Sequence, residues 1–118
     1  MNIYIICPVR LADPLRIASF REYAKQKRDE GHSVHFPPDD VNQSDPTGLA
    51  ICDSHRTAMY WADEVHIFWD VDSKGSHFDL GMAFALEKRL VPVAHIQDDG
   101  ESKSYWKVIN AVYSAHAA

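Results

Sequence analysis

Short apolar runs and longer amphipathic runs alternate along the whole chain, and this alternation limits the folds open to it. Four runs rich in Ile, Val, Phe or Trp predict buried strands, at residues 2–7, 33–36, 64–69 and 90–96. Apolar residues at helical spacing predict helices that cover roughly 14–30, 46–61, 76–88 and 103–115. Strands that alternate with helices form parallel sheets with helices on both faces. We therefore expect residues 1–118 to form a single α/β domain, a three-layer sandwich with a flavodoxin-like or Rossmann-like sheet of four to five parallel strands.

The loops that follow the predicted strands are the natural place for a ligand. In open parallel sheets, ligands bind outside the carboxyl ends of the strands. The relevant loops span residues 7–14, 37–46, 70–77 and 97–103. Residues 37–47 contain three Pro and three Asp, so we expect a long polar loop there.

Composition and charge exclude several classes of partner. Twelve basic and 17 acidic residues give a formal charge of 12 − 17 = −5, and no basic stripe is present, which argues against polymeric nucleic acid. No apolar run approaches the roughly 20 residues that span a bilayer, so no membrane is expected. The N-terminus does not resemble a signal peptide, and Cys7 and Cys52 both lie in apolar stretches. We expect a cytoplasmic protein whose cysteines are small buried hydrophobes.

Familiar cofactor motifs are missing from the sequence. The five glycines, at 31, 48, 75, 81 and 100, form neither a P-loop nor a dinucleotide-binding G-x-G-x-x-G, and no G-x-S-x-G nucleophile elbow exists. His32 and His35 are three residues apart on a predicted strand, so they point to opposite faces and are not a metal pair. We expect neither a metal nor a cofactor.

The segment from residue 62 to residue 85 carries the strongest functional signal. A helix that begins just after a strand presents free N–H groups, which bind anions such as phosphate. Ser73, Lys74 and Ser76 would add donors at this helix start. Asp79 is expected in the first helical turn, where an acid either stabilises the helix dipole or acts as a functional carboxylate.

The same segment resembles the nucleoside 2-deoxyribosyltransferase family, and most closely its 2′-deoxynucleoside 5′-monophosphate N-glycosidase branch. In that family the strand-opening Asp precedes the catalytic acid by 16 positions, as Asp63 precedes Asp79 here (79 − 63 = 16). The matching positions are Ala62-Asp63, Gly75, Asp79, Leu80-Gly81 and Ala83.

This resemblance implies a small nucleoside or nucleotide substrate and a homodimer. Asp79 would be the nucleophile or would stabilise an oxocarbenium ion, and His55 would contact the sugar. The residues that would bind substrate are Tyr4, Arg10, Asp63, Ser73 and Ser76, of which Arg10, Ser73 and Ser76 would hold a 5′-phosphate. The base would stack on an aromatic side chain, for which the candidates are Tyr4, Phe36, Trp61 and Trp69. The partner subunit would complete the site near Ser102 and Ser104.

Two departures from the family pattern leave alternatives open. The family nucleophile is normally Glu, and Asp79 is one methylene shorter. A second family Asp is replaced by His55. The chain is therefore either an N-glycosidase or deoxyribosyltransferase, or a nucleotide-binding module without catalysis. A flavodoxin-like FMN-binding domain is a third reading.

Overall fold

The computed structural model describes residues 1–9, 12–42, 44–97 and 103–117. The elements follow one another as β1 (Asn2–Ile6), α1 (Pro14–Asp29), β2 (Ser33–His35), α2 (Pro37–Asp40), α3 (Leu49–Trp61), β3 (Glu64–Asp70), α4 (Lys74–Ala85), β4 (Arg89–Gln97) and α5 (Tyr105–Ala117).

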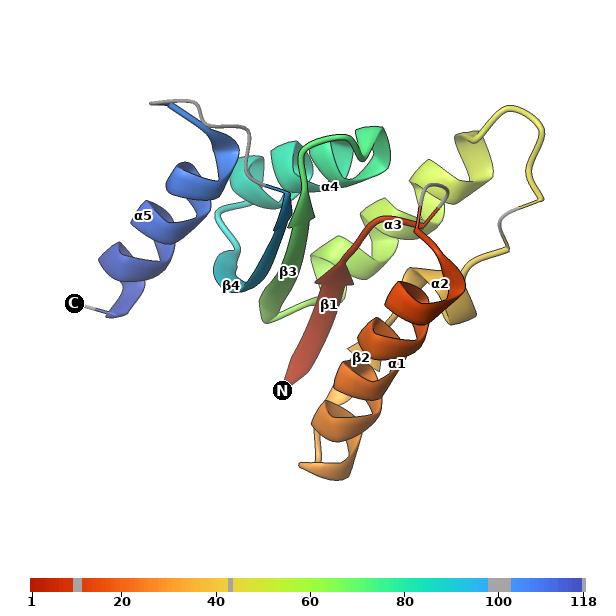
Figure 1. The fold of residues 1–118 in the computed structure, drawn as a ribbon, viewed down its shortest axis with the longest axis horizontal. Helices are drawn as coiled ribbons and strands as arrows, with labels where there is room; N and C mark the ends of the chain where they lie inside the picture. Colours follow the sequence, from red (N-terminus) through yellow and green to blue (C-terminus); the bar gives the residue numbers. More distant parts are fainter. Residues whose placement is uncertain (10–11, 43, 98–102, 118) are drawn as a thin grey trace.

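Four parallel strands form one sheet in the order β2-β1-β3-β4 (Figure 1). The predicted α/β class and the parallel sheet are confirmed, with four strands in the part of the chain that the structure describes. Tyr4 in β1 lies opposite His35 in β2 and Val65 in β3. Residues that pair in this way have side chains on the same face, so strand pairing alone brings Tyr4 and His35 together.

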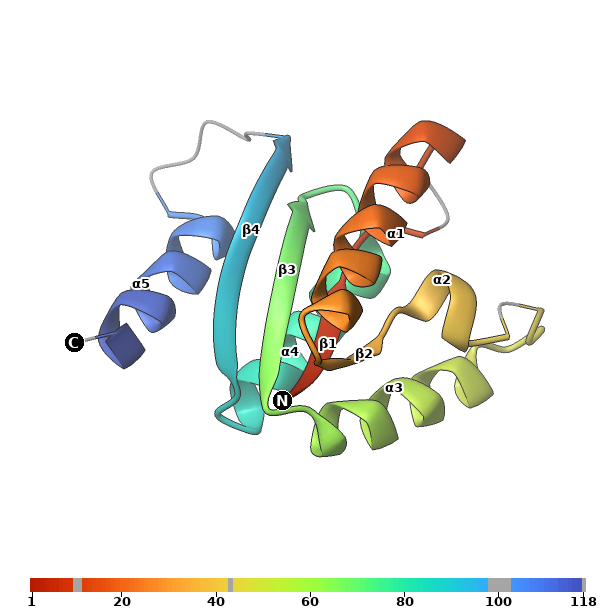
Figure 2. The ribbon, with the colours of Figure 1, turned by 90° about the horizontal axis from the view of Figure 1, so that it is seen from below.

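Helices cover both faces of the sheet, and each face has its own apolar cluster (Figure 2). On one face, Tyr4, Ile6 and Ile67 pack against α3 and α4. On the other face, Ile3 and Ile5 pack against Phe20 and Ala24 of α1. Helix α5 lies beside β4 and adds Ile109 to the cluster that contains α3 and α4 (Figure 1). The three layers expected from the alternating sequence pattern are therefore present.

The segment after β2 differs from the predicted loop. Residues Pro37–Asp40 form the short helix α2, in which Pro supplies the fixed φ that suits a first helical turn. Asp40 accepts a hydrogen bond from the backbone N–H of Phe36 (2.7 Å) and stabilises this turn. Helix α3 begins at Leu49, not near Pro46, because the carboxylate of Asp45 reaches forward and accepts from the N–H of Ala50 (2.6 Å).

Helix α4 begins two residues earlier than the expected Ser76. Ser73 is the N-cap, and its hydroxyl accepts from the N–H of Ser76 (3.3 Å). The helix ends at Ala85, before Glu87 adopts a positive φ of 56°. Asp79 therefore lies beyond the first turn, so the expectation of a first-turn acid that stabilises the helix dipole was wrong.

Both cysteines are free, and Cys7 is buried as expected while Cys52 is partly buried. None of the helices within the described ranges combines the length and the apolar character needed to cross a membrane.

Candidate functional site

A buried carboxylate lies at the centre of the candidate site. Asp79 is 4% exposed and faces the sheet from α4, beside Leu80 and Ala83 of the apolar cluster. The hydroxyl of Tyr4 donates to its Oδ2 (2.7 Å), and Nδ1 of His55 lies 3.0 Å from its Oδ1. A carboxylate withdrawn from water needs such partners. Three residues singled out in the sequence are thus brought into direct contact by β1, α3 and α4.

Tyr4 is fixed as a hydrogen-bond donor. Its side chain is completely buried in the middle of β1. Burial, followed by the nearby charge of Asp79, raises the pKa of Tyr4 well above its usual value. The phenol therefore keeps its proton and continues to donate to the carboxylate. The same two causes, in the same order, raise the pKa of Cys7 to about 12, so this thiol is not a nucleophile at neutral pH.

His35 joins this group, although the sequence analysis treated it only as half of a rejected metal pair. Its ring stacks on Tyr4, with centroids 5.1 Å apart and planes at 28°, and lies 6.3 Å from the ring of His55. Burial lowers the pKa of His35, which keeps the ring neutral at pH 7. The signal that finds His35 is the pairing of β1 with β2, and residue spacing does not supply it.

Two ring nitrogens in this group lack a partner. Nε2 of His35 and Nε2 of His55 are buried, and neither forms a hydrogen bond to any residue that the structure describes. Most buried polar atoms are paired, so an exception needs an explanation. A ligand that supplies hydrogen-bonding groups is one such explanation.

The start of α4 offers anion-binding groups near Asp79. Ser73 and Ser76 are buried, and the Ser73 hydroxyl donates to the Ser76 hydroxyl (2.8 Å). The two serines therefore shape the first turn, while the N–H groups of Lys74 and Gly75 have no carbonyl partner within the helix.

The structure does not bring Asp63 into this group. Asp63 comes just before the first residue of β3, whereas α4 begins beyond the last residue of that strand. The carboxylate of Asp63 accepts a hydrogen bond from the N–H of Asn2 (2.8 Å). Arg10 and Ser102 lie outside the described residues. The hydroxyl of Ser104 accepts from the N–H of Lys107 (3.2 Å) at the start of α5.

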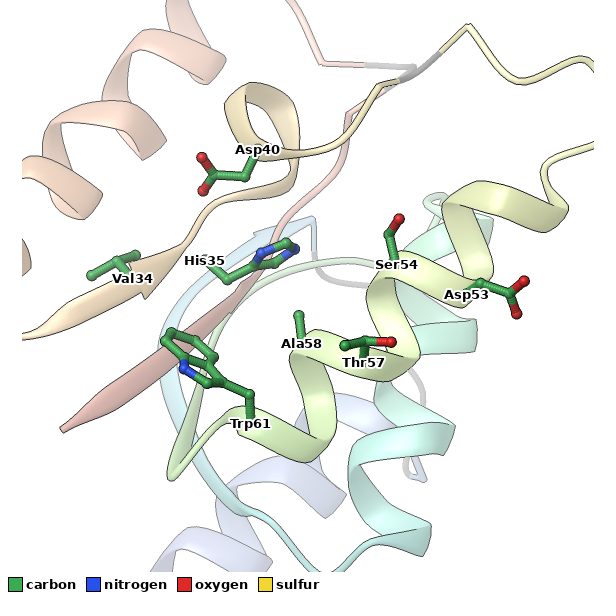
Figure 3. A pocket seen from close by; sticks show the side chains of 8 residues that line it. All are labelled: Val34, His35, Asp40, Asp53, Ser54, Thr57, Ala58 and Trp61. Atoms are coloured by element: carbon green, nitrogen blue, oxygen red, sulfur yellow. The ribbon is translucent and has the colours of Figure 1, made fainter.

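A cleft of about 630 Å³ opens between β2 and α3, next to the buried group (Figure 3). The imidazole of His35 extends from β2 toward α3 and forms part of its wall. Among the aromatic candidates for stacking on a base, Trp61 lines this cleft and is 39% exposed, whereas Phe36 and Trp69 are core residues. The lining is completed by Val34, Asp40, Asp53, Ser54, Thr57 and Ala58.

Comparison with known proteins identifies the fold. No family model and no curated protein matches the sequence. Among solved structures, the CMP N-glycosidase BcmB of Clostridium botulinum superimposes with a TM-score of 0.66 and 15% identity, over 95% of this chain and 82% of that chain. A 2-deoxyribosyltransferase of Bacillus psychrosaccharolyticus gives a TM-score of 0.62 and 21% identity, over 89% of this chain and 78% of that chain.

The chain therefore has the α/β fold of enzymes that act at N-glycosidic bonds. The resemblance to nucleoside 2-deoxyribosyltransferases, predicted from residues 62–85, is confirmed at the level of the fold.

Proposed function

We propose that this protein cleaves or transfers the N-glycosidic bond of a nucleoside or a nucleoside 5′-monophosphate. The observation that carries the proposal is the Asp79 carboxylate, buried on the inner face of α4 and held by Tyr4 and His55. The chain shares its fold with a CMP N-glycosidase and a 2-deoxyribosyltransferase, and this likeness supports the same class of reaction here.

The reaction needs a negative group beneath C1′ of the sugar. When the C1′–N bond breaks, its electron pair leaves with the base, and positive charge develops over C1′ and the ring oxygen. The Asp79 carboxylate stabilises that charge or bonds to C1′. In hydrolysis, water adds its hydroxide to C1′ and gives its remaining proton to the departed base. In transfer, a nitrogen of a second base bonds to C1′ instead. Tyr4 and His55 hold the carboxylate in one orientation, and such positioning lowers the barrier.

A 5′-phosphate is proposed to bind at the start of α4. The free N–H groups and the positive end of the helix dipole favour an anion there. Lys74 adds a positive charge that is exposed to solvent, and Ser73 and Ser76 hold the turn in place. Arg10 remains a proposed phosphate contact.

Base release from a panel of substrates tests the proposal. We would incubate the protein with ribonucleosides, deoxyribonucleosides and their 5′-monophosphates, with and without a second free base, and separate the products by chromatography. Asp79→Asn keeps the size of the side chain and removes its charge, so kcat is expected to fall by about 100-fold or more. Asp29→Asn is the matched control, because this exposed carboxylate pairs with Lys25 on the surface of α1 and its loss should leave turnover unchanged.

The same assay separates an enzyme from a binding module. If no substrate releases its base but some raise the melting temperature, the chain binds nucleotides without catalysis and the proposal is overturned. Asp79→Glu provides a second arm, since a catalytic scaffold should gain hydrolysis from the longer carboxylate. Equal behaviour of Asp79→Glu and Asp79→Ala would favour the binding module. A yellow preparation that holds FMN would instead favour the flavodoxin-like alternative.

We also propose that two copies associate. Phe84 on α4, with Tyr105 and Val108 on α5, exposes a large apolar side chain at one shared surface pocket, and pairing would cover these three residues. Light scattering of the purified protein should give twice the mass of one chain. For Phe84→Glu the measured mass should fall to that of a single chain. A single-chain mass for the unaltered protein would contradict this.

A further inference from the structure

We propose that the site selects ribose over 2-deoxyribose, with Nε2 of His55 accepting a hydrogen bond from the 2′-hydroxyl. The inference rests on the proposed function, because it places C1′ of the sugar over Asp79. It goes beyond that function by naming the sugar and the atom that recognises it.

The contact with Asp79 sets the tautomer of His55. A carboxylate can only accept hydrogen bonds, so the proton between Nδ1 and Oδ1, which are 3.0 Å apart, belongs to Nδ1. In the neutral ring the other nitrogen, Nε2, then carries a lone pair and no proton. This nitrogen is buried and accepts from no described group. With the ring in this form, the site contains an acceptor that lacks a donor.

The position of this acceptor matches the 2′-hydroxyl. C2′ is the ring carbon next to C1′, so a hydroxyl on C2′ lies beside the carboxylate that faces C1′. The ring of His55, on α3, is hydrogen-bonded through Nδ1 to Oδ1 of that carboxylate. A ribose 2′-hydroxyl can donate to Nε2, whereas the hydrogen on C2′ of 2-deoxyribose cannot. In glycoside cleavage, hydrogen bonds to the neighbouring hydroxyl also strengthen as the bond breaks.

His35 provides a second unpaired nitrogen close by. Its ring centroid is 6.3 Å from that of His55, and its Nε2 is also buried without a partner. Adjacent hydroxyls on one sugar can engage adjacent rings, so we assign His35 to the 3′-hydroxyl, which both sugars have. His35 also forms part of the wall of the cleft between β2 and α3, so the ring next to His55 borders an opening.

The surroundings favour hydroxyls over other ligands. A phosphate would meet the Asp79 carboxylate and would find no lysine or arginine among the side chains that contact His55, Tyr4 and Asp79 in the described structure. No group of three or more His, Cys, Asp or Glu residues within the described ranges could hold a metal ion. Uncharged donors such as sugar hydroxyls are the remaining chemistry.

Two substitutions at one position test the inference. In His55→Asn, the side-chain amide can still donate to Asp79 from the position of Nδ1, but no atom remains at the position of Nε2. In His55→Gln, the longer side chain can place a polar atom near the position of Nε2, but the donor to Asp79 is lost. The unaltered protein should prefer a ribonucleotide to its 2′-deoxy counterpart by about 10- to 100-fold in kcat/KM, as expected for one buried hydrogen bond. His55→Asn should bring that ratio to within about threefold by removing the same bond. His55→Gln should lower turnover of both sugars and retain most of the ratio.

Binding of the product sugars keeps the two proposals apart. Ribose 5-phosphate and 2-deoxyribose 5-phosphate contain no base to lose, so calorimetry gives their affinities whether or not the chain is catalytic. The expected result is tighter binding of ribose 5-phosphate, with the difference lost in His55→Asn. Such binding without base release would support sugar selection and overturn the proposed function. Equal affinities and equal kcat/KM for the two sugars would overturn sugar selection and leave the proposed function standing. If the protein neither binds these sugars nor releases a base, sugar selection and the proposed function are both overturned.

Discussion

At the scale of single residues, the hydroxyl of Tyr4 is the simplest group to test. Tyr4→Phe removes the donor to Oδ2 of Asp79 and changes little else in volume. We expect kcat/KM to fall by about 10- to 100-fold, because a hydrogen bond to a charged group is lost and the carboxylate is free to turn. Steady-state assays of base release would measure this.

Tyr60→Phe is the control for that experiment. Tyr60 is an exposed tyrosine of α3, and its substitution removes a hydroxyl that does not reach Asp79. If Tyr4→Phe and Tyr60→Phe have the same activity, the contact between Tyr4 and Asp79 does not matter for turnover.

The family resemblance pointed to part of the candidate site and not to the rest, for a clear reason. The resemblance to nucleoside 2-deoxyribosyltransferases pointed to Tyr4, His55 and Asp79, and the structure places Tyr4 and His55 within hydrogen-bond distance of Asp79. His35 was not among them, because its contact with Tyr4 depends on the register between β1 and β2. Asp63 fits the family spacing, and the structure places it just before β3, at the opposite end of that strand from Ser73 and Ser76.

At the scale of elements, the start of α4 should depend on Ser73. Ser73→Ala removes the side chain that caps the helix and should lower the free energy of unfolding by about 1 kcal/mol. If a 5′-phosphate binds at this helix start, the KM for nucleotides should rise more than the KM for nucleosides. Urea denaturation and parallel assays with both substrates would check the two effects, with exposed Ser114→Ala on α5 as the control. An unchanged midpoint would contradict the capping role.

The strands and the long helices were predictable, while the short helix α2 and several element ends were not. The strands and the four long helices follow from apolar periodicity. The start of α3 at Leu49 depends on Asp45, whose side chain caps the helix from several residues away. The first residue of α4 depends on whether Ser73 or Ser76 is the N-cap, since both side chains have a hydroxyl that can accept from a backbone N–H. In the structure Ser73 is the N-cap. Local sequence preferences do not separate such choices.

At the scale of the whole molecule, stability should decrease in mild acid. His66 is buried between the Tyr23 hydroxyl (2.6 Å from Nδ1) and Glu64 (3.0 Å from Nε2), and burial lowers its pKa despite the nearby carboxylate. Burial also lowers the pKa of His35. Below about pH 6.5 these two histidines bind protons in the unfolded chain more readily than in the folded chain. Proton binding therefore stabilises the unfolded state relative to the folded state.

Melting temperatures between pH 7.5 and pH 5 would measure this dependence. They should fall as the pH falls, and His66→Gln should flatten the decline. His116→Gln removes an exposed histidine on α5 and should leave the decline unchanged. Identical slopes for both variants would contradict the assignment to His66.

The fold class was the most predictable property of the molecule. Alternation of strand and helix leaves few topologies, and the parallel sheet with helices on both faces is one of them. The order β2-β1-β3-β4 puts β1 and β3 at the centre, which matches their runs of buried residues. The cleft between β2 and α3 could not be predicted, because its shape depends on how the side chains of both elements pack.

The site is divided in the chain by the segment between α2 and α3. Tyr4 and His35 precede this segment, and His55 and Asp79 follow it. A cut there leaves each fragment with half of the chemical groups, so neither fragment alone can orient the carboxylate. Two fragments fused to interacting partners would regain base release only when the partners meet. Under the proposed function, base release from the reassembled fragments would then measure the association of the two fused proteins.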